Sequence, residues 1–439
     1  MSRSFLKSSI LLRMAIIAFL TLLLLIPAAI VESLIKERSE RRDSAIHEVS
    51  EKWGLPQVIS GPILTIPIRH FVQDEKGKEI PLIEHLHILP DSLAIEGQLS
   101  TETRARGIYE VILYNSQLSL SGGFNLGDIS SLLQNGYTAI WNDAVITIGI
   151  SDPRGIKENV QMVIGEQAYS ASAGVRFPDI VSSGITVLPK VDGTTKNYSF
   201  SFSLNLNGSS EIQFCPLGRQ TTINLKSSWP SPSFTGAFLP DSRSLSDSGF
   251  SCNWNVLELN RNFPQFWLNK RYDVSESVFG VRLLQSVDEY QKTLRTAKYA
   301  ILIISLTFLA FFLSEVLSKE TLHPIHYSLV GLCLVLFYLL LIALSEHFGF
   351  DSAYFISATS IIVLIGLYSM AIAAQHKTAV VIATVLCLIY VFLYIVLQNE
   401  DYALLIGSLG LLTIMAIVMY LTRKVDWYTV ENPEQQKQP

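Results

Sequence analysis

The sequence predicts a mixed membrane protein, in which six transmembrane α-helices carry a large all-β, sandwich-like domain inserted between the first helix and the second. Three observations predict this class. The composition is apolar, with 49% hydrophobic and only 16% charged residues, against roughly 25% charged residues in soluble domains. The apolar residues gather in long uncharged runs towards the two ends of the chain. Much of the segment between them, residues 32–298, alternates polar and apolar residues with the period of a β-strand.

The composition also excludes several classes of protein. A chain of 439 residues with this apolar content is neither intrinsically disordered nor a small disulfide-stapled domain. The net charge of −5 supplies no basic footprint for phosphates, so we expect no nucleic-acid partner. The lipid bilayer is therefore the first partner that the sequence predicts.

Six apolar runs are each about 20 residues long, which is enough to cross a ~30 Å hydrocarbon core as a helix. They are residues 14–31, 299–316, 327–344, 353–374, 378–397 and 402–421. The first run follows Arg3, Lys7 and Arg13, a pattern that also fits a cleaved signal peptide. We expect an uncleaved anchor instead, because the run is longer than a signal sequence needs and the bulky Ile30 and Val31 follow its small residues.

Basic residues in the short segments predict that both termini are cytoplasmic, because positive charges are retained on that side. These residues all fall on one side of the series and are Arg3, Lys7, Arg13, Lys319, Lys377, Arg423 and Lys424. The short loops on the other side, around 346–352 and 398–401, have neither Lys nor Arg. Residues 32–298 then face outward, which means the periplasm if the host is a Gram-negative bacterium. Basic residues that flank this long segment, such as Arg38 and Arg295, carry less weight in this prediction of topology, because long domains cross the membrane largely regardless of their charge.

Five segments follow along the chain. We expect a cytoplasmic N-terminus and first helix at 1–31, a juxtamembrane helix at 32–54, a periplasmic β-rich domain at 55–298, a five-helix bundle at 299–421 and a cytoplasmic tail at 422–439. Acidic and basic residues three and four apart before Gly54 predict that the first helix continues into water. From Leu55 to about Arg282, strand-like runs between Gly, Asn, Pro and Ser clusters predict many short strands.

Several strings carry a family resemblance. The long ones are "SSWPSPSFTGAFLP" (227–240), "SGFSCNW" (248–254), "KYAILIISLTFLAFF" (298–312), "HPIHYSLVGLCLVLFYLLLIALSEHFGF" (323–350) and "DYALLIGSLGLL" (401–412), and "SDPRGI" (151–156) is a shorter one. Over nearly its whole length the chain resembles the CreD family of bacterial inner-membrane proteins. The resemblance implies a role in cell envelope integrity under a stress-responsive two-component system and, for some members, altered tolerance to colicins or β-lactams. It implies no catalytic residues.

The sequence contains none of the common catalytic motifs. It has no G-x-x-x-x-G-K-[ST] phosphate loop, no H-E-x-x-H zinc helix and no G-x-S-x-G elbow. Within "GISDPRGIK", Asp152, Pro153 and Gly155 predict a turn rather than a phosphate site. We therefore expect no enzyme activity, no catalytic or cofactor-binding residue and no cofactor.

Three histidines raise the alternative of a metal site. His85 and His87 lie two apart, on the same side of a predicted strand, and His70 lies on the preceding strand. A turn centred near Lys76 sets His70 opposite Leu82 rather than beside His87. Without an evident fourth ligand, we favour a solvated strand face over zinc, and we predict no metal site.

Cys215 and Cys252 both fall in the outer domain, where oxidising conditions permit a disulfide. Buried free cysteines are also common in protein cores, so the two are either bridged or free. Cys333 and Cys387 lie within predicted spans and cannot join them.

The most suggestive polar residues lie at the ends of the helix bundle. They are Glu315, Glu346, His347, Asp351, Glu400 and Asp401. An intramembrane carboxylate such as Glu315 is costly and therefore a functional candidate, although in the simpler interpretation it snorkels or pairs with Lys319. The outer residues either follow the charge asymmetry of the topology, or bind a divalent cation or the basic ends of the β domain near Arg295 and Lys298.

We favour a non-enzymatic inner-membrane protein that supports envelope integrity and whose outer β domain binds or senses an envelope component or another periplasmic or membrane protein. The alternative is a transporter of a small molecule or lipid through the helix bundle. Transport is disfavoured because the sequence lacks paired charges in mid-membrane and lacks Gly- or Pro-broken helices in the last five spans.

Overall fold

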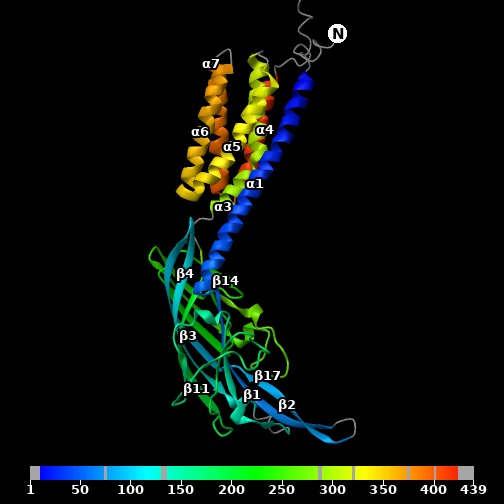
Figure 1. The fold of residues 1–439 in the computed structure, drawn as a ribbon. Helices are drawn as coiled ribbons and strands as arrows, with labels where there is room; N and C mark the ends of the chain where they lie inside the picture. Colours follow the sequence, from blue (N-terminus) through cyan, green and yellow to red (C-terminus); the bar gives the residue numbers. More distant parts are fainter. Residues whose placement is uncertain are drawn as a thin grey trace, which may run out of the picture. The chain divides into compact units, whose positions relative to one another are not determined.

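The computed structural model describes residues 10–73, 77–129, 136–284, 289–318, 322–372, 376–399 and 402–423 (Figure 1). These residues form two compact units. The helical unit comprises the chain up to Arg42 and the later segment from helix α3 onward, and the β unit begins at Asp43. The domain bounds predicted from the sequence separate lipid-facing from water-facing segments, and they stay predictions.

Six helices of the described chain are long and apolar enough to cross a membrane, as the sequence predicts. They are α1 (Ile10–Trp53), α4 (Ala300–Ser318), α5 (Pro324–Phe348), α6 (Phe350–Ile372), α7 (His376–Gln398) and α8 (Ala403–Thr422). The second half of α1 is charged and is supported by ion pairs four residues apart, such as Glu37 with Arg41 and Glu48 with Lys52. Helix α1 therefore continues past its apolar half, as the sequence predicts.

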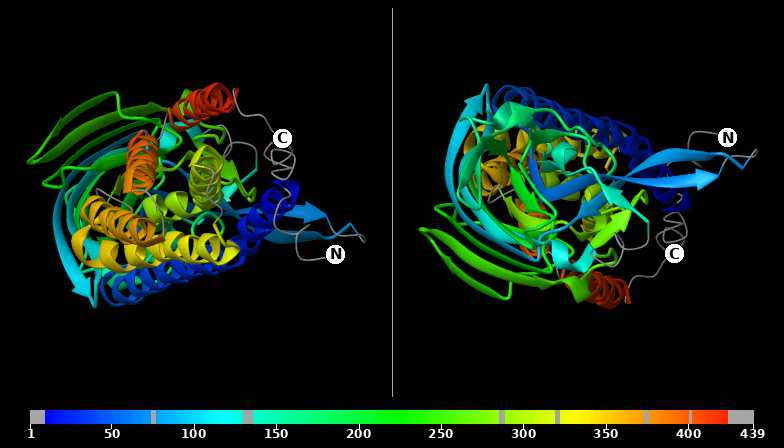
Figure 2. Two further views of the ribbon diagram at one scale, coloured as in Figure 1. Left: turned by 90° about the horizontal axis from the view of Figure 1, so that it is seen from above. Right: turned by 90° about the horizontal axis from the view of Figure 1, so that it is seen from below.

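Helices α5 and α6 follow each other with a single residue between them. Gly349 has a φ of +78° and its N–H donates to the Ser345 carbonyl, so it closes α5 as a glycine cap. The sequence predicts a loop around residues 346–352, and this is wrong because both helices extend into it. Helix α5 packs against α6, α6 against α7, and α4 against both α5 and α7. Seen end-on, α8 lies at the edge of the helical unit beside α7 (Figure 2).

Helix α1 packs closely on α5 at Gly331. A Cβ atom at this position would lie 2.1 Å from Leu24 Cδ1, so only glycine leaves space for the leucine. Leu24, Val31 and Ile35 are the buried apolar residues of α1. The described part of α1 is thus held against the bundle by one stripe of side chains.

A short helix, α3 (Glu289–Lys298), precedes α4 and was not expected from the sequence. Its buried face is formed by Tyr290, Thr293, Thr296 and Ala297, which follow the three-and-four spacing of a helix. Two of these residues are threonines, whose hydroxyls donate to carbonyls of their own helix. Such a weakly apolar stripe is hard to recognise in a segment that otherwise contains strands.

The β unit is built from two sheets. One has ten strands: β14 (Pro232–Gly236), β18 (Phe279–Leu283), β12 (Glu211–Phe214), β1 (Gln57–Gln73), β6 (Val145–Ile150), β10 (Gly184–Val187) and β9 (Ser172–Ala173) in that order, with β2 (Glu79–Ile88) and β5 (Thr138–Ala139) also on β1 and β17 (Phe266–Leu268) on β2. The other has the order β15 (Ser242–Ser246), β16 (Gly249–Leu257), β13 (Gln220–Ser227), β3 (Ser92–Arg106), β4 (Tyr109–Asn125), β11 (Asn197–Ser209), β7 (Gln161–Ile164) and β8 (Gln167–Ser170).

Apolar side chains of both sheets share one large cluster, so the predicted sandwich-like architecture is confirmed. Trp254 of one sheet and Phe279 of the other are fully buried, and their rings lie 5.5 Å apart. The pairing is not wholly antiparallel, since β1 pairs β12, and β13 pairs β3, in parallel. Strand β1 is central because its first half pairs β12 and β6 while its second half pairs β2.

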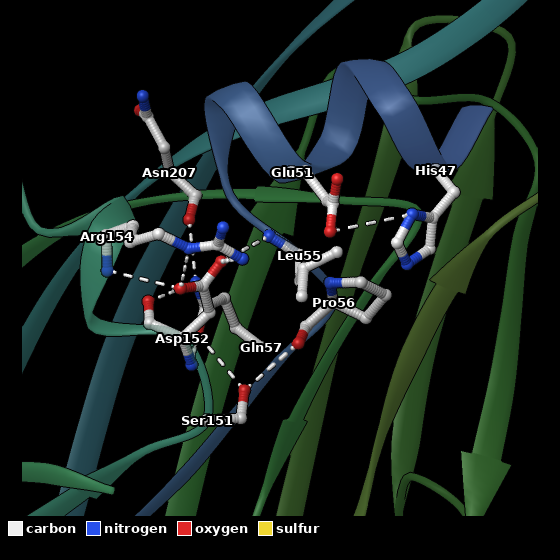
Figure 3. A network of polar contacts seen from close by, with 9 residues as sticks. All are labelled: His47, Glu51, Leu55, Pro56, Gln57, Ser151, Asp152, Arg154 and Asn207. Carbon is white, nitrogen blue, oxygen red and sulfur yellow. Dashed lines mark hydrogen bonds and ion pairs between the residues drawn. The ribbon is translucent and has the colours of Figure 1, made fainter. Parts of the chain in front are cut away.

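The segment that links α1 to β1 is hydrogen-bonded to the turn predicted from "SDPRG" (Figure 3). Pro153–Gly155 form a 3-10 turn capped by Asp152, which confirms that prediction. The Asp152 carboxylate accepts from Leu55 N at 2.9 Å and from Arg154 Nε at 2.8 Å. The buried amide of Gln57 donates to the carbonyls of Asp152 and Asn207, at 3.0 Å each.

Two glycines bring these segments together. A Cβ atom at Gly54 would lie 2.5 Å from the Asn207 oxygen, and one at Gly155 would lie 2.3 Å from the same oxygen. Although burial of Asp152 works in the opposite direction, hydrogen bonds from Arg154 and from Leu55 N hold the pKa of this carboxyl below its usual value. Asp152 is therefore an ionised acceptor on which the entry of the chain into the β unit depends.

We expect Asp152→Ala to lower the free energy of unfolding of the β unit by about 2–3 kcal/mol, because Leu55 N and Arg154 lose their acceptor. Urea unfolding of the full-length protein in detergent, followed by tryptophan fluorescence, measures this change. The matched control is Asp143→Ala, whose residue is exposed on the surface of the same unit. Equal stability of the two variants would contradict the role assigned to Asp152.

Candidate functional site

Glu315 on α4 is buried within the helical unit and has two bonding partners. Its carboxylate lies 2.8 Å from Arg13 Nη1 of α1 and accepts from the Tyr327 hydroxyl of α5 at 3.0 Å. The Glu315 side chain is 3% exposed and that of Arg13 is 29% exposed, so the pair reaches the surface on the arginine side. The predicted alternative partner, Lys319, lies outside the described residues. The structure instead joins three helices through this carboxylate.

A small cavity of about 10 Å³ lies beside Glu315. Its lining includes the hydroxyl residues Ser314, Ser318, Ser369 and Thr378. The buried Ser369 hydroxyl has no hydrogen-bond partner among the residues that the structure describes. The cavity is about the size of one water molecule, which could bond to these hydroxyls.

Glu346, at the other end of the bundle, is held by residues of α1 and α3. It accepts from the Tyr290 hydroxyl at 2.9 Å and lies 3.7 Å from Arg38 Nη1. Arg42 stacks over the Tyr290 ring at 5.2 Å. The basic residues that follow the apolar half of α1 thus meet an acidic residue of α5. His347, the next residue, is exposed and stacks on the Phe348 ring.

Asp351 starts α6 and belongs to a separate polar group. Its carboxylate accepts from Gln398 Nε2 at 2.6 Å and from the Tyr394 hydroxyl at 3.2 Å, both on α7. Lys292 of α3 donates to the Gln398 side chain at 3.3 Å. Glu400 and Asp401, which the sequence also singles out, lie outside the described residues. Among the described residues, no group of three or more His, Cys, Asp or Glu is arranged to hold a metal ion.

The histidines of β1 and β2 are placed in the predicted register, with His70 opposite Leu82. His85 Nδ1 and His87 Nε2 lie 3.8 and 3.9 Å from Asp179 Oδ2, whereas His70 lies beside Glu84. The expectation of a solvated face is wrong for His87, which is 1% exposed. Strand β17 pairs with β2 and sets a tryptophan ring 5.7 Å from His87, so this imidazole is covered.

Burial lowers the pKa of His87 to about 4, although the charge of Asp179 works in the opposite direction. Its Nδ1 lies 3.0 Å from the Thr65 hydroxyl on β1. His87 is therefore neutral at pH 7 and part of the packing between β1, β2 and β17.

The two cysteines of the β unit are free thiols in separate hydrophobic clusters. The Cys215 thiol donates to the Val274 carbonyl and the Cys252 thiol to the Leu225 carbonyl. The structure therefore does not bring them together as a disulfide. Burial raises the pKa of each thiol to about 12, so both stay protonated and unreactive at neutral pH.

The solvent-facing side of the eight-stranded sheet carries an almost uncharged polar surface, which the sequence did not single out. Two cross-strand rows show this. They are Ser242, Asn253, Asn224, Glu96, Ser119 and Ser203, and Ser244, Ser251, Lys226, Gln98, Gln117 and Asn205. We call these twelve residues the polar face. Each row contains a single charged residue, and the remaining side chains are hydroxyls and amides.

A groove of about 480 Å³ lies over one end of the polar face, above β3, β13, β15 and β16. Within it, Asn253 Nδ2 donates to Asn224 Oδ1 at 2.6 Å, and Asn224 Nδ2 donates to Glu96 Oε1 at 2.6 Å. This chain of bonds fixes the orientation of both amides. Every residue of the edge strand β15 is exposed. The alternation of Ser and Asn with apolar residues in β4 and β11 is the sequence signal that could have revealed the polar face.

Comparison with known proteins identifies relatives of the whole chain. The sequence model of a family described as "Inner membrane protein CreD" matches residues 9–428. The protein named "Inner membrane protein CreD" of Escherichia coli (strain K12) is 33% identical over 434 residues, which cover 98% of this chain and 96% of the relative. The similarity therefore includes both the helical unit and the β unit.

We expect Glu315→Gln to lower the stability of the helical unit by about 2 kcal/mol. This is less than the ~3–5 kcal/mol of fully buried pairs, because Arg13 is partly exposed. Thermal unfolding in detergent measures the change. A double-mutant cycle with Arg13→Gln isolates the coupling energy between the charges of Glu315 and Arg13. Glu32→Gln is the matched control, since the Glu32 pair with Lys36 is a surface pair. A coupling no larger than that of the control would contradict the pairing.

The β unit should lose stability as the pH falls from about 6.5 to about 4. The unfolded chain binds a proton at His87 near its usual pKa of 6.5, whereas the folded chain does so only near 4. The loss is on the order of 3 kcal/mol and is complete below pH 4. Unfolding midpoints of the full-length protein between pH 7.5 and 4.5 test this. In His87→Gln the slope over this range should be shallower, and an unchanged slope would sink the assignment.

Proposed function

Because the chain belongs to the CreD family of inner membrane proteins, we propose that it supports the integrity of the cell envelope from within the inner membrane. In this proposal both termini are cytoplasmic and the β unit lies in the periplasm. The protein acts by binding an envelope component through the β unit, without catalysing a reaction, and the helices anchor it in the bilayer.

The proposed orientation follows from the basic residues of the short segments, which lie on one side of the helix series. Arg38 and Arg42 are two of the basic residues on the other side, and both have partners in the helical unit. Arg38 lies beside Glu346, and Arg42 stacks on Tyr290. Their charges are therefore engaged in the helical unit, which supports giving them little weight in the assignment of topology.

The observation that carries the binding role is the groove on the polar face. A chain of fixed amides that ends on the Glu96 carboxylate presents donors and acceptors at set positions, as small binding sites do. Hydroxyl groups both donate and accept hydrogen bonds, so they suit a surface of amides and hydroxyls. A hydroxyl-rich, weakly charged polymer of the envelope, such as a glycan strand, is the ligand class that we propose for this groove.

The test is co-sedimentation of the full-length protein, in nanodiscs, with isolated cell-wall sacculi. We expect binding by the unmodified protein and several-fold weaker binding by Asn224→Ala and by Glu96→Ala, since each removes hydrogen bonds of about 1 kcal/mol. Glu79→Ala is the control, because this glutamate is exposed on β2 in the other sheet.

The same variants should be expressed in cells that lack the native protein. The proposal expects Glu79→Ala to restore envelope tolerance and the two groove variants to restore it only in part. If sacculi fail to sediment the unmodified protein, or if the groove variants bind as it does, the polar face is not the binding site.

A further inference from the structure

The helical unit contains a second, much larger groove that the proposed function does not use. It has a volume of about 750 Å³ and lies between α4, α7 and α8. Helix α8 has no buried residue, and its main packing contact is with α7. One face of α8 therefore stands apart from α4, and the side chains of α4 and α7 form the base of the space.

The groove is apolar along its length and polar at one end. Leucine, isoleucine and valine side chains make up most of its lining. The polar side chains at one end are Ser314, Ser318, Lys377 and Thr378, and Lys377 is the single charged residue among the lining residues of the described chain. Three of these residues, all but Lys377, also line the small cavity beside Glu315. Glu315 itself is occupied by Arg13 and Tyr327, so its charge is countered.

The length of the groove is set by a close contact at its apolar end. A Cβ atom at Gly410 of α8 would lie 2.2 Å from the Phe392 ring of α7, so the two helices meet there. The distance along α7 from Phe392 to Lys377 is about 22 Å at 1.5 Å per residue. One leaflet of a ~30 Å hydrocarbon core accounts for roughly 15 Å. An acyl chain that begins at the level of Lys377 therefore fits within the groove.

We propose that this groove binds the acyl chains of an anionic phospholipid whose phosphate lies at Lys377. Lys377 is the one cation among the described lining residues, and a cation at the mouth of an apolar groove is complementary to an apolar chain that ends in an anion. Basic pockets between transmembrane helices on the cytoplasmic side have this role in other membrane proteins. Only the choice of leaflet rests on the proposed orientation, and the binding itself does not depend on the ligand of the β unit.

The chemistry of the lining favours a lipid over a second copy of the chain. A second protein helix in the groove would bring its own side chains against Lys377 and would need an acceptor there, whereas a phosphate supplies one directly. The hydroxyls of Ser314, Ser318 and Thr378 add donors at the same level. The lipid fills the space between α4 and α8 and so becomes part of the packing of α8.

Native mass spectrometry of the purified full-length protein, titrated with phosphatidylglycerol or phosphatidylethanolamine, tests the proposal. We expect bound phosphatidylglycerol to exceed phosphatidylethanolamine, and Lys377→Gln to reduce this preference about fivefold, the worth of one cation near an anionic surface. Ala310→Phe places a ring in the groove and should abolish retention of both lipids. Thr413→Phe, on α8, does the same from the other wall.

Two control variants keep the outcome interpretable. Lys36→Gln removes an exposed cation of α1, and Ala371→Phe adds a ring to an exposed position of α6. Both should bind lipid as the unmodified protein does. The proposal is overturned if Ala310→Phe and Thr413→Phe keep the same lipids as these controls, or if the protein is a dimer that Ala310→Phe converts to lipid-free monomers. Sacculus binding by Lys377→Gln reports on the β unit separately, so the two proposals can fail independently.

Discussion

The absence of water in the hydrocarbon layer is the constraint on which the helical unit depends. Each lipid-facing segment has to satisfy its backbone hydrogen bonds internally, and this is why the apolar runs are helices. The same constraint decides where polar side chains lie. Glu315 is bonded to an arginine of α1 and a tyrosine of α5, and Glu346, near the other end of the bundle, has partners on α1 and α3. Both carboxylates thus lie near the ends of the bundle and have a partner on α1.

In the β unit the solvent is water, which can bond to exposed backbone groups. The arrangement of the strands is therefore limited by side-chain packing rather than by the need to satisfy every backbone hydrogen bond internally. Two sheets bury their apolar faces against each other and leave one outward face nearly free of charge. Solubility does not require a water-exposed surface to be uncharged. The repeated serines and asparagines of the polar face are therefore not explained by solubility. The segment that starts β1 is held within this unit by hydrogen bonds to the turn at Asp152, which accepts from Leu55 N and from the amide of Gln57.

Local sequence patterns were sufficient to predict much of this architecture. They were not sufficient to predict contacts between residues that are distant in the sequence. The length and lack of charge of the apolar runs predict the six long helices, and the polar turn between β1 and β2 correctly places His70 opposite Leu82. The partner of Glu315 is distant in sequence, whereas the lysine four residues later is the neighbour that a helical pattern suggests. His87 is buried by β17, whose position beside β2 no local pattern reveals. The polar face likewise depends on the order of strands, which brings together polar residues from six separate strands.

The single glycine between α5 and α6 has a consequence for how the chain enters the bilayer. Because one residue joins the two helices, the connection is too short for one helix to insert into the bilayer before the other. The two helices therefore insert together, as a hairpin. The tip of this hairpin carries Glu346 and Asp351, and in the orientation proposed above their carboxylates have to cross the hydrocarbon layer. The partners of Glu346, Arg38 on α1 and Tyr290 on α3, precede it in the chain and are already synthesised when its carboxylate emerges. The partners of Asp351 lie on α7 and are synthesised after it. The order of segments along the chain therefore provides partners in advance for one of the two acidic residues of the tip.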